Sequence, residues 1–505
     1  MQAFMPLPEN NVPTIMAAFG ATGDLMRVKV IPALFHLHTK GQLPTMFRVV
    51  GFSRRPWSDD EFRAHVKGVV DIHTKGLFDA TKIDSFLDIF SFQRGDFDEK
   101  DSYEALKKTF DRLDTEWGVC ANKLFYLAVA PEFYTTIATH VAQSKLSEPC
   151  APGGGWTRIV VEKPFGEDTK SARKIDEHLA TIFDEKQIYR IDHYLGKEML
   201  RNILIFRFSN NLFEIPWGKE LIEKINIRVA ESIGVEKRGP FYDATGTLRD
   251  VGQNHLLQII ALLTMERPRT FTDTAIREER RKALEHIKKP TLQHIQRYSF
   301  RAQYEGFREI PGVAKASNTE TYFKVRVDID APRWKGVPIY MEWGKRLGEA
   351  QKEIVITFKH PRPCLCPPGK HHKNEVIIRL EPKEEILIEF WSKKPGYTLE
   401  TEARMFHFLF RERGSTAQYT EEYEKMLLDC IAGDQTLFIS TEEIRAMWRY
   451  IDPIVAAWKK NATPLHFYKP DDKKIVEEAR VIESGVQTSA RGYTSASRKR
   501  TTTHD

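Results

Sequence analysis

The sequence predicts an α/β domain built on a parallel sheet, followed by a β+α domain with a large mixed or antiparallel sheet. Two observations carry this prediction. Residues 13–52 contain an apolar run, a glycine turn, a helical pattern and a second apolar run, which is the order of a βαβ unit. After about residue 200, strand-like runs follow one another with few helices between them, which favours antiparallel pairing.

The first apolar run, residues 13–19 (PTIMAAF), ends at Gly20, as a buried parallel strand does. Helical spacing of apolar residues extends to about Thr39, and residues 47–52 (FRVVGF) form the next strand. Further buried strands are predicted at residues 123–130, 158–162 and 187–192. This pattern is typical of a Rossmann-like dinucleotide-binding domain, which we place at residues 10–195.

The second domain is placed at residues 196–480. Residues 223–229 (EKINIRV) alternate like a half-buried strand, and residues 247–265 are expected to form one long helix. The remaining strands are expected at residues 322–327, 337–343, 353–358, 374–380 and 385–390, and two closing helices at residues 421–432 and 441–458. From residue 481 to residue 505 the composition turns to Ser, Thr, Gly and Arg, which predicts a disordered tail.

Composition excludes several classes of protein. The 505 residues are 41% hydrophobic and 29% charged, which suits a globular chain, and no apolar stretch reaches the length of about 20 residues that a membrane span needs. The N-terminus lacks the pattern of a secretory signal, so we expect a cytoplasmic protein. The net charge of +6 suits anionic small molecules. Nucleic-acid binding is not expected, because the obvious basic cluster is confined to the tail, at residues 498–500.

Five cysteines are too few for a disulfide scaffold, and we expect reduced thiols. Cys364 and Cys366 form a C-x-C motif with His360, His371 and His372 nearby, so a zinc site has to be considered. Zinc sites favour a C-x₂₋₄-C spacing with a matching second pair, which is missing here, and the prolines around the motif indicate a surface loop. No metal is therefore predicted.

Two features predict a dinucleotide site. Gly20 and Gly23 follow a strand and open a helix, where glycine lets the backbone approach a pyrophosphate and helix N–H groups favour anions. The full G-x-G-x-x-G spacing is absent, so an ordinary strand–helix turn is the alternative. Arg54 ends the second strand, where a protein that binds NAD usually carries an acid, and arginine favours the 2′-phosphate of NADP. The two features together favour NADP as the cofactor.

Polar residues follow two later strands, where a substrate site is expected. Lys163 stands at the carboxyl end of a strand, the edge at which parallel sheets bind ligands, and can contact both coenzyme and substrate. Residues 192–197 (DHYLGK) combine His, Tyr and Lys donors beside a helix start, which suits a phosphate, and Asp192 can orient a histidine. The alternatives are a surface lysine before a proline and a structural histidine.

Residues 249–255 (RDVGQNH) open a helix whose polar start gives way to an apolar run. On a helix with 3.6 residues per turn, Asp250 and His255 lie roughly 140° apart. Both can therefore touch one ligand only if the ligand lies across the helix or if the helix is irregular. The alternative is a helix with a solvated N-terminal end.

These segments closely resemble the glucose-6-phosphate dehydrogenase family. The resemblance rests on residues 20–25 (GATGDL), 162–166 (EKPFG), 190–197 (RIDHYLGK), 249–250 (RD) and 253–258 (QNHLLQ), in the order and spacing of the family. It extends from about residue 14 to about residue 470. It implies oxidation of glucose 6-phosphate at C1 to 6-phosphoglucono-1,5-lactone with hydride transfer to NADP, the first step of the oxidative pentose phosphate pathway.

The resemblance also implies roles for individual residues. His255 matches the general base, and Asp192 matches the carboxylate that orients it. The substrate-binding matches are Lys163, His193, Tyr194, Lys197, Glu231, Asp250 and Lys345. The cofactor-binding matches are Gly20, Thr22, Gly23, Asp24, Leu25, Arg54 and again Lys163. Assembly through the large sheet into a homodimer or homotetramer is implied as well.

The chain departs from the family pattern at two places. Where the family often has Gln in an Arg-x-Gln-Pro motif, this chain has Glu381, an acid that can still accept hydrogen bonds. Many members hold a second, structural NADP in the C-terminal domain. Leu387 and Glu389 stand at the Tyr and Lys positions of that site, so we expect the site to be absent or much weakened, since Glu repels phosphate.

Two other functions are considered. One is a related hexose-6-phosphate dehydrogenase of broader specificity, against which the missing secretory signal and the missing lactonase-sized domain argue. The other is a non-catalytic NADP-sensing homologue, against which the joint presence of His255, Asp192 and Lys197 argues.

Overall fold

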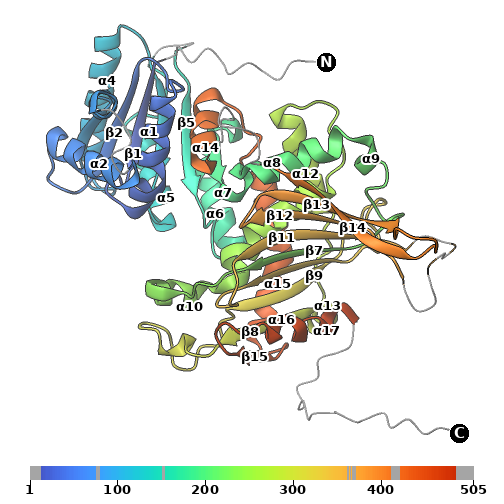
Figure 1. Ribbon diagram of the computed structural model, residues 1–505. Helices are drawn as coiled ribbons and strands as arrows, with labels where there is room; N and C mark the ends of the chain where they lie inside the picture. Colours follow the sequence, from blue (N-terminus) through green and yellow to red (C-terminus); the bar gives the residue numbers. More distant parts are fainter. Residues whose placement is uncertain are drawn as a thin grey trace, which may run out of the picture.

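The computed structural model describes residues 13–74, 80–150, 154–360, 363, 366, 371–410 and 421–484. These residues form two sheets, one in each half of the chain, with helices packed around them (Figure 1). In this part of the chain, no helix is long and apolar enough to cross a bilayer.

The N-terminal sheet has six parallel strands in the order β3-β2-β1-β4-β5-β6. The strands are β1 (Thr14–Phe19), β2 (Phe47–Ser53), β3 (Phe90–Arg94), β4 (Asn122–Leu127), β5 (Thr157–Glu162) and β6 (Ile188–Ile191). Every residue of β1 and β4 is buried, as expected of a parallel sheet covered on both faces. The strand order reverses between β1 and β4, which is where doubly wound folds bind their ligands.

Helices and short turns connect these strands. They are the π-helix η1 (Met26–Val30), α1 (Ile31–Thr39), α2 (Asp59–Thr74), α3 (Ala80–Leu87), α4 (Lys100–Trp117), η2 (Pro131–Phe133), α5 (Tyr134–Gln143), α6 (Thr169–Ala180), η3 (Glu185–Gln187) and α7 (His193–Gly196). Local sequence sets their ends. Gly118 closes α4 with a φ of 64°, and Asp168 caps α6 by accepting the amide of Ser171.

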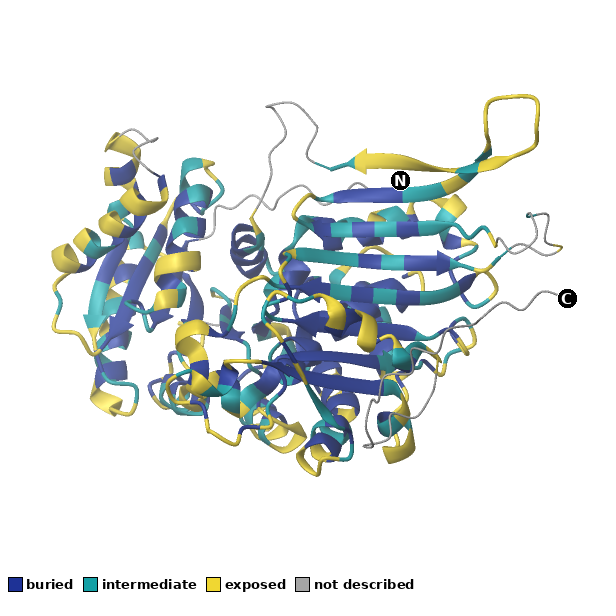
Figure 2. Ribbon diagram, turned by 60° about the horizontal axis from the view of Figure 1, so that its bottom comes forward, coloured by how far each residue is buried: buried dark blue, intermediate teal, exposed yellow. Residues whose placement is uncertain are grey.

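The second sheet has nine strands in the order β14-β13-β12-β11-β7-β10-β9-β8-β15. The strands are β7 (Ile222–Ala230), β8 (Ser299–Tyr304), β9 (Tyr322–Val327), β10 (Ile339–Gly344), β11 (Gln351–Phe358), β12 (Glu375–Glu381), β13 (Glu385–Lys393), β14 (Thr401–Leu409) and β15 (Leu465–Tyr468). The pairs β7–β10 and β8–β15 are parallel, and the other neighbours are antiparallel. The edge strand β14 is largely exposed (Figure 2).

The helices of this half pack along the sheet and beside the first domain. They are α8 (Glu198–Phe208), α9 (Asn211–Glu214), η4 (Glu236–Arg238), α10 (Gly239–Thr247), the π-helix η5 (Leu248–Leu256), α11 (Leu257–Thr264), α12 (Asp273–Glu285), α13 (Leu292–Tyr298), η6 (Phe307–Glu309), α14 (Glu422–Ala432), α15 (Thr441–Lys459), α16 (Lys474–Glu478) and α17 (Val481–Ser484). Although α14 comes late in the chain, it lies beside β5 (Figure 1). There Arg158 donates to the carbonyl oxygens of Cys430 at 2.6 Å and Ile431 at 2.8 Å, which joins the two halves.

The predicted fold class is confirmed, and several details are corrected. The sequence does not predict β3, β8, β14 or β15; β14 has no buried face to produce an apolar alternation. The helix predicted at residues 247–265 is present, but its first part is the π-helix η5 and only α11 is an α-helix. The first four residues of the predicted tail form α17, in which Ile482 is fully buried. Residues 485–505 lie outside the described residues, and the domain limits stay a prediction.

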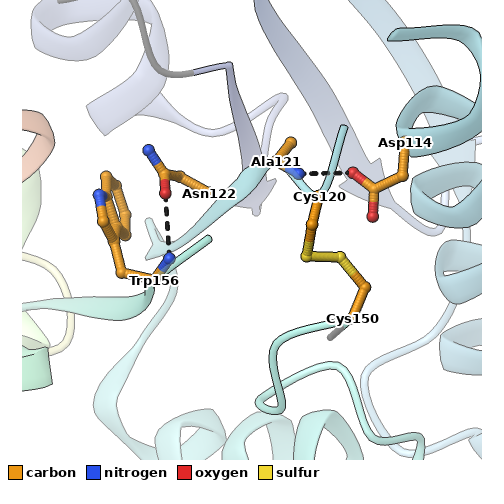
Figure 3. Close-up of a disulfide and its surroundings, with 6 residues drawn as sticks. All are labelled: Asp114, Cys120, Ala121, Asn122, Cys150 and Trp156. Atoms are coloured by element: carbon orange, nitrogen blue, oxygen red, sulfur yellow. Dashed lines mark hydrogen bonds between the residues drawn. A yellow bond between two sulfur atoms is a disulfide. The ribbon is translucent and has the colours of Figure 1, made fainter. Parts of the chain in front are cut away.

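The cysteines correct another expectation. Cys120 and Cys150, expected as thiols, form a disulfide with their Cα atoms 5.8 Å apart (Figure 3). Cys120 precedes β4 and Cys150 lies in the loop before β5. The pairing of these neighbouring strands therefore brings together two residues that are 30 positions apart. Cys366 and Cys430 are free, and Cys364 of the C-x-C motif lies outside the described residues.

Candidate active site

The turn after β1 packs tightly against the loop after β4. Gly20 has a φ of 76°, the left-handed region that favours glycine, and a Cβ there would lie 2.5 Å from the carbonyl oxygen of Ala128. The amide of Gly23 donates to the carbonyl oxygen of Gly20 at 2.9 Å. Only glycine fits this turn, which stands at the reversal point of the sheet, the position of pyrophosphates in doubly wound folds.

The two arginines after β2 have different surroundings. Arg54 is exposed at the end of the strand. Arg55, which the sequence analysis does not assign, donates from Nε to Oγ1 of Thr22 at 3.2 Å, and its guanidinium lies 4.9 Å from the ring centre of Trp57. Arg55 therefore ties the end of β2 to the glycine turn, a role that the adjacency of two arginines in the sequence does not reveal.

The other two residues expected at the coenzyme have local partners. Asp24 is exposed and forms an ion pair with Arg27 at 2.8 Å. Leu25 is partly buried and packs against the hydrophobic core. A contact between Leu25 and a coenzyme would therefore come from its backbone.

Lys163 lies directly after β5 and reaches the second domain. Its Nζ donates to the carbonyl oxygen of Asp250 at 3.0 Å and to Oδ1 of the same residue at 3.3 Å. Burial raises the pKa of Asp250, but the charges of Lys163 and then Arg238 outweigh it, so the pKa lies below its usual value. The carboxylate of Asp250 is therefore ionised at neutral pH and can accept hydrogen bonds.

Glu162, the residue before Lys163, is buried among tyrosines from three elements. Its carboxylate accepts from the hydroxyl of Tyr126 at 2.6 Å and from that of Tyr423 at 3.4 Å, and its carbonyl oxygen accepts from Tyr134 at 2.8 Å. Burial raises the pKa of Glu162 to about 7, although the two hydrogen bonds to the carboxylate lower it. This network fixes the backbone from which Lys163 extends.

The residues predicted as the catalytic pair meet across the two halves of the molecule. Asp192 follows β6, and its Oδ1 accepts the amide of Tyr194 at 3.0 Å and also accepts a hydrogen bond from Nδ1 of His255 on η5. Both side chains are buried. Burial raises the pKa of Asp192, whereas burial and then the charge of Lys163 lower the pKa of His255. His255 is therefore neutral at neutral pH, with its proton on Nδ1 and its Nε2 available as a base.

A metal centre is the other chemistry that this cluster suggests. Ligand atoms of Asp192, His193 and His255 lie within 4.8 Å of one another. However, the carboxylate of Asp192 and the imidazole of His255 are directed at each other, as in an acid–base pair, whereas the ligands of one ion all point at the ion.

The π-helix explains how Asp250 and His255 share one site. In a π-helix the N–H of residue i+5 bonds to the carbonyl oxygen of residue i, so residues five apart lie on the same side of the helix. The electrostatics agree, because Asp250 raises the pKa of His255 and His255 lowers that of Asp250. Of the two alternatives left by the sequence, the structure has the irregular helix.

Aromatic rings surround the imidazole of His255. The ring of Tyr194 stacks on it with centroids 4.1 Å apart, and the ring of His193 meets it edge-on at 4.7 Å. Trp343, which the sequence analysis does not assign, lies 6.3 Å from the imidazole and 5.9 Å from the ring of Tyr194. These contacts hold the imidazole in one orientation and place His193 and Tyr194 beside it.

Ion pairs hold the remaining predicted substrate residues. Nζ of Lys345 lies 2.6 Å from Oε2 of Glu231, and Nζ of Lys197 lies 3.2 Å from Oε1 of Glu381. Lys352 lies 2.8 Å from the same oxygen of Glu381, and its charge lowers the pKa of His255. The sequence analysis misses Lys352, because one lysine just before the strand predicted at residues 353–358 looks like a solvated residue. The pairing of its strand with that of Glu381 is the signal that could have found it.

Comparison with known proteins tests the resemblance. A family model described as glucose-6-phosphate dehydrogenase, NAD binding domain, matches residues 17–202. A second, described as glucose-6-phosphate dehydrogenase, C-terminal domain, matches residues 204–487. Together they span nearly the whole described chain.

Individual proteins agree with the family models. Glucose-6-phosphate 1-dehydrogenase of Borreliella burgdorferi is 37% identical over 472 residues, which cover 91% of this chain and 95% of that protein. Glucose-6-phosphate 1-dehydrogenase 6, cytoplasmic, of Arabidopsis thaliana is 33% identical over 493 residues, which cover 96% and 94%. A solved structure of glucose-6-phosphate dehydrogenase in complex with its substrate glucose-6-phosphate has a TM-score of 0.87 and 31% identity, covering 95% of this chain and 99% of that chain.

The strand order of both sheets, the glycine turn at the reversal point and the matches to both domains lead to one conclusion. The chain belongs to the glucose-6-phosphate dehydrogenase family and has its activity, that of a glucose-6-phosphate 1-dehydrogenase.

Proposed function

We propose that this dehydrogenase uses NADP in preference to NAD and oxidises glucose 6-phosphate at C1 with His255 as the general base. The observation that carries the proposal is the buried pair of His255 and Asp192, which stands among lysines beyond the carboxyl ends of β5 and β6. A base at the mouth of a dinucleotide crevice, next to cations, suits the oxidation of a phosphorylated alcohol.

The residues at the reversal point fit a dinucleotide. Gly20 packs so closely against the backbone of Ala128 that a Cβ has no room, and a tight glycine turn between strand and helix is the form that pyrophosphate sites take in doubly wound folds. We assign the pyrophosphate to the Gly20–Gly23 turn and the 2′-phosphate to Arg54, with Arg55 holding the turn in place through Thr22. When bound, NADP supplies the hydride acceptor, and Lys163 is the residue that we place between coenzyme and substrate.

The acid–base chemistry follows from the hydrogen bond between the two buried side chains. Nδ1 of His255 is engaged by Asp192, so Nε2 removes the proton of the C1 hydroxyl. The imidazolium that forms lies against the carboxylate of Asp192, which stabilises the positive charge. Burial, followed by the charge of Lys163, lowers the pKa of His255 and so keeps the imidazole neutral before the reaction.

We assign the remaining polar groups to the substrate. His193, Tyr194 and Lys197 bind the phosphate, and the carboxylates of Glu231 and Asp250 accept from sugar hydroxyls. Lys345, which is paired with Glu231, donates to the sugar and fixes the acceptor beside it.

The test compares initial rates of nicotinamide reduction for different substrates and coenzymes. We expect the highest kcat/KM for glucose 6-phosphate with NADP. Equal rates with galactose 6-phosphate would favour the broader hexose-6-phosphate dehydrogenase, and equal rates with NAD would refute the coenzyme preference. Binding of NADP without turnover would favour a sensor.

We further propose that the protein is a cytoplasmic homodimer or homotetramer assembled through the second sheet. Phe406 and Phe408 on the edge strand β14 are 63% and 50% exposed, and an open apolar edge favours association with another chain. The cytoplasmic location is supported by the name of the Arabidopsis thaliana relative. Light scattering coupled to size exclusion tests the assembly; a monomeric mass at working concentration would contradict it.

A further inference from the structure

Glu381 lies between two lysines. Its Oε1 is 2.8 Å from Nζ of Lys352 and 3.2 Å from Nζ of Lys197. Lys352 and Glu381 are directly opposed on the antiparallel strands β11 and β12, so the fold itself places them together. Both lysine side chains are less than 20% exposed, at 17% and 19%, so neither is a freely solvated surface group.

The three charges face the active site. The ammonium groups of Lys197 and Lys352 lie 5.4 Å and 5.6 Å from the ring centre of Tyr194, within cation–π distance. The same ring stacks on the imidazole of His255. Lys163 follows β5 of the first sheet, whereas Lys352 belongs to β11 of the second sheet. Lys352 therefore reaches the site beside Lys197, where we place the substrate phosphate.

The carboxylate of Glu381 occupies the hydrogen-bonding positions that a phosphate needs. Both lysines donate to one oxygen of Glu381, and a phosphomonoester dianion would offer them the same kind of acceptor with more charge. Glu381 thus competes with the phosphate, while Lys352 supplies the cation that offsets the negative charge of Glu381.

We propose that Lys352 is a further phosphate-binding residue and that Glu381 is a resident competitor, so that this pair sets the affinity for the phosphate of the substrate. The proposal rests on the phosphate role of Lys197 given above. It explains why an acid is tolerated at position 381, since with Lys352 beside it the group of three retains a net positive charge.

The experiment measures KM and kcat of the full-length enzyme for glucose 6-phosphate and for glucose, which lacks the phosphate. We expect Glu381→Gln to lower KM for glucose 6-phosphate several-fold with little change in kcat, because the phosphate is remote from C1. Lys352→Met should raise this KM roughly tenfold, the lower end of what a hydrogen bond to a charged group contributes. At a pH above the acid limb, where His255 is neutral in every variant, neither substitution should alter kcat/KM for glucose more than about twofold.

The double variant separates the two roles. If Glu381 competes as proposed, Lys352→Met combined with Glu381→Gln has a KM closer to wild type than Lys352→Met alone. The matched control is the Lys373–Glu223 ion pair, 2.7 Å long and at the other end of β12. The same substitutions there should leave both substrates unaffected.

Inhibition by inorganic phosphate gives a second measurement that does not depend on turnover of the sugar. Its inhibition constant should fall in Glu381→Gln and rise in Lys352→Met. An unchanged or higher KM in Glu381→Gln, or equal effects on glucose and glucose 6-phosphate, would overturn the proposal. If Lys197→Ala abolishes the preference for the phosphorylated sugar while Lys352→Met keeps this preference, only the proposed role of Lys352 fails. If Lys197→Ala also keeps the preference, the assignment of Lys197 to the phosphate fails.

Discussion

Nδ1 of His255 is hydrogen-bonded to Oδ1 of Asp192, and the same oxygen accepts the backbone amide of Tyr194. Asp192 belongs to the end of the first sheet, whereas His255 belongs to a π-helix of the second half. The pair therefore exists only when the two halves are packed together. It also fixes which imidazole nitrogen can act as a base.

Replacing the base should affect turnover more than binding. We expect His255→Asn to lower kcat by roughly 10²- to 10⁴-fold, the usual contribution of a general base, with little change in KM. Steady-state kinetics measure this, and retained NADP binding shows that the fold is intact. His286→Asn, at an exposed histidine, is the control. Near-normal turnover in His255→Asn would remove the base assignment.

The pH dependence should respond to Lys163. His255 must be neutral to act as a base. Because its pKa is lowered, it stays neutral at pH values at which an ordinary histidine would already be protonated. Lys163→Met removes a cation that lowers this pKa, so the pKa rises and the acid limb of the kcat/KM profile moves to higher pH, by roughly one unit. Lys170→Met, at an exposed lysine, should leave the limb in place. A limb that stays or moves to lower pH in Lys163→Met would contradict the electrostatic argument.

The two arginines after β2 should have separable effects. Arg54→Ala should reduce the ratio of kcat/KM for NADP to that for NAD roughly tenfold or more, since a hydrogen bond to a charged group is lost only with NADP. Arg55→Ala should weaken both coenzymes, because Arg55 supports the glycine turn through Thr22. Kinetics with both coenzymes test this. An unaltered ratio in Arg54→Ala would place the 2′-phosphate elsewhere.

Burial of Glu162 should appear in the pH dependence of stability. Its pKa is raised from the model-peptide range to about 7, so between pH 4.5 and about 7 the folded state binds more protons and stability falls as pH rises. Glu162→Gln removes the ionisable carboxyl and with it this pH-dependent loss of stability. We therefore expect its Tm relative to wild type to be higher at pH 7.5 than at about pH 5, measured by thermal denaturation. Glu132→Gln, at an exposed acid, should show no such difference, and the same flat result in Glu162→Gln would show that this carboxyl does not titrate as stated.

The sequence predicts what depends on local pattern and misses what depends on pairing. Apolar runs reveal the buried strands, and a dense polar motif reveals Asp192. The sequence leaves the position of His255 relative to Asp250 open between two alternatives, because an angle calculated at 3.6 residues per turn cannot show that the helix there is a π-helix. The sequence also does not reveal the disulfide of Cys120 and Cys150 or the position of Lys352 beside Glu381. Each depends on which strands pair and in what register, and that is not visible in the local sequence pattern.

Coenzyme stoichiometry should be one NADP per protomer. Glu389 of β13 directly opposes Glu375 of β12, and burial, followed by the charge of Glu375, raises its pKa. Leu387, two residues earlier, is buried and offers no hydrogen bond. Two neighbouring acids repel a phosphate, so calorimetric titration with NADP should show a single event. The double variant Arg54→Ala/Arg55→Ala should lose that event. A second high-occupancy event in wild type, or a full event persisting in the double variant, would mean that this face of the sheet binds NADP despite its acids.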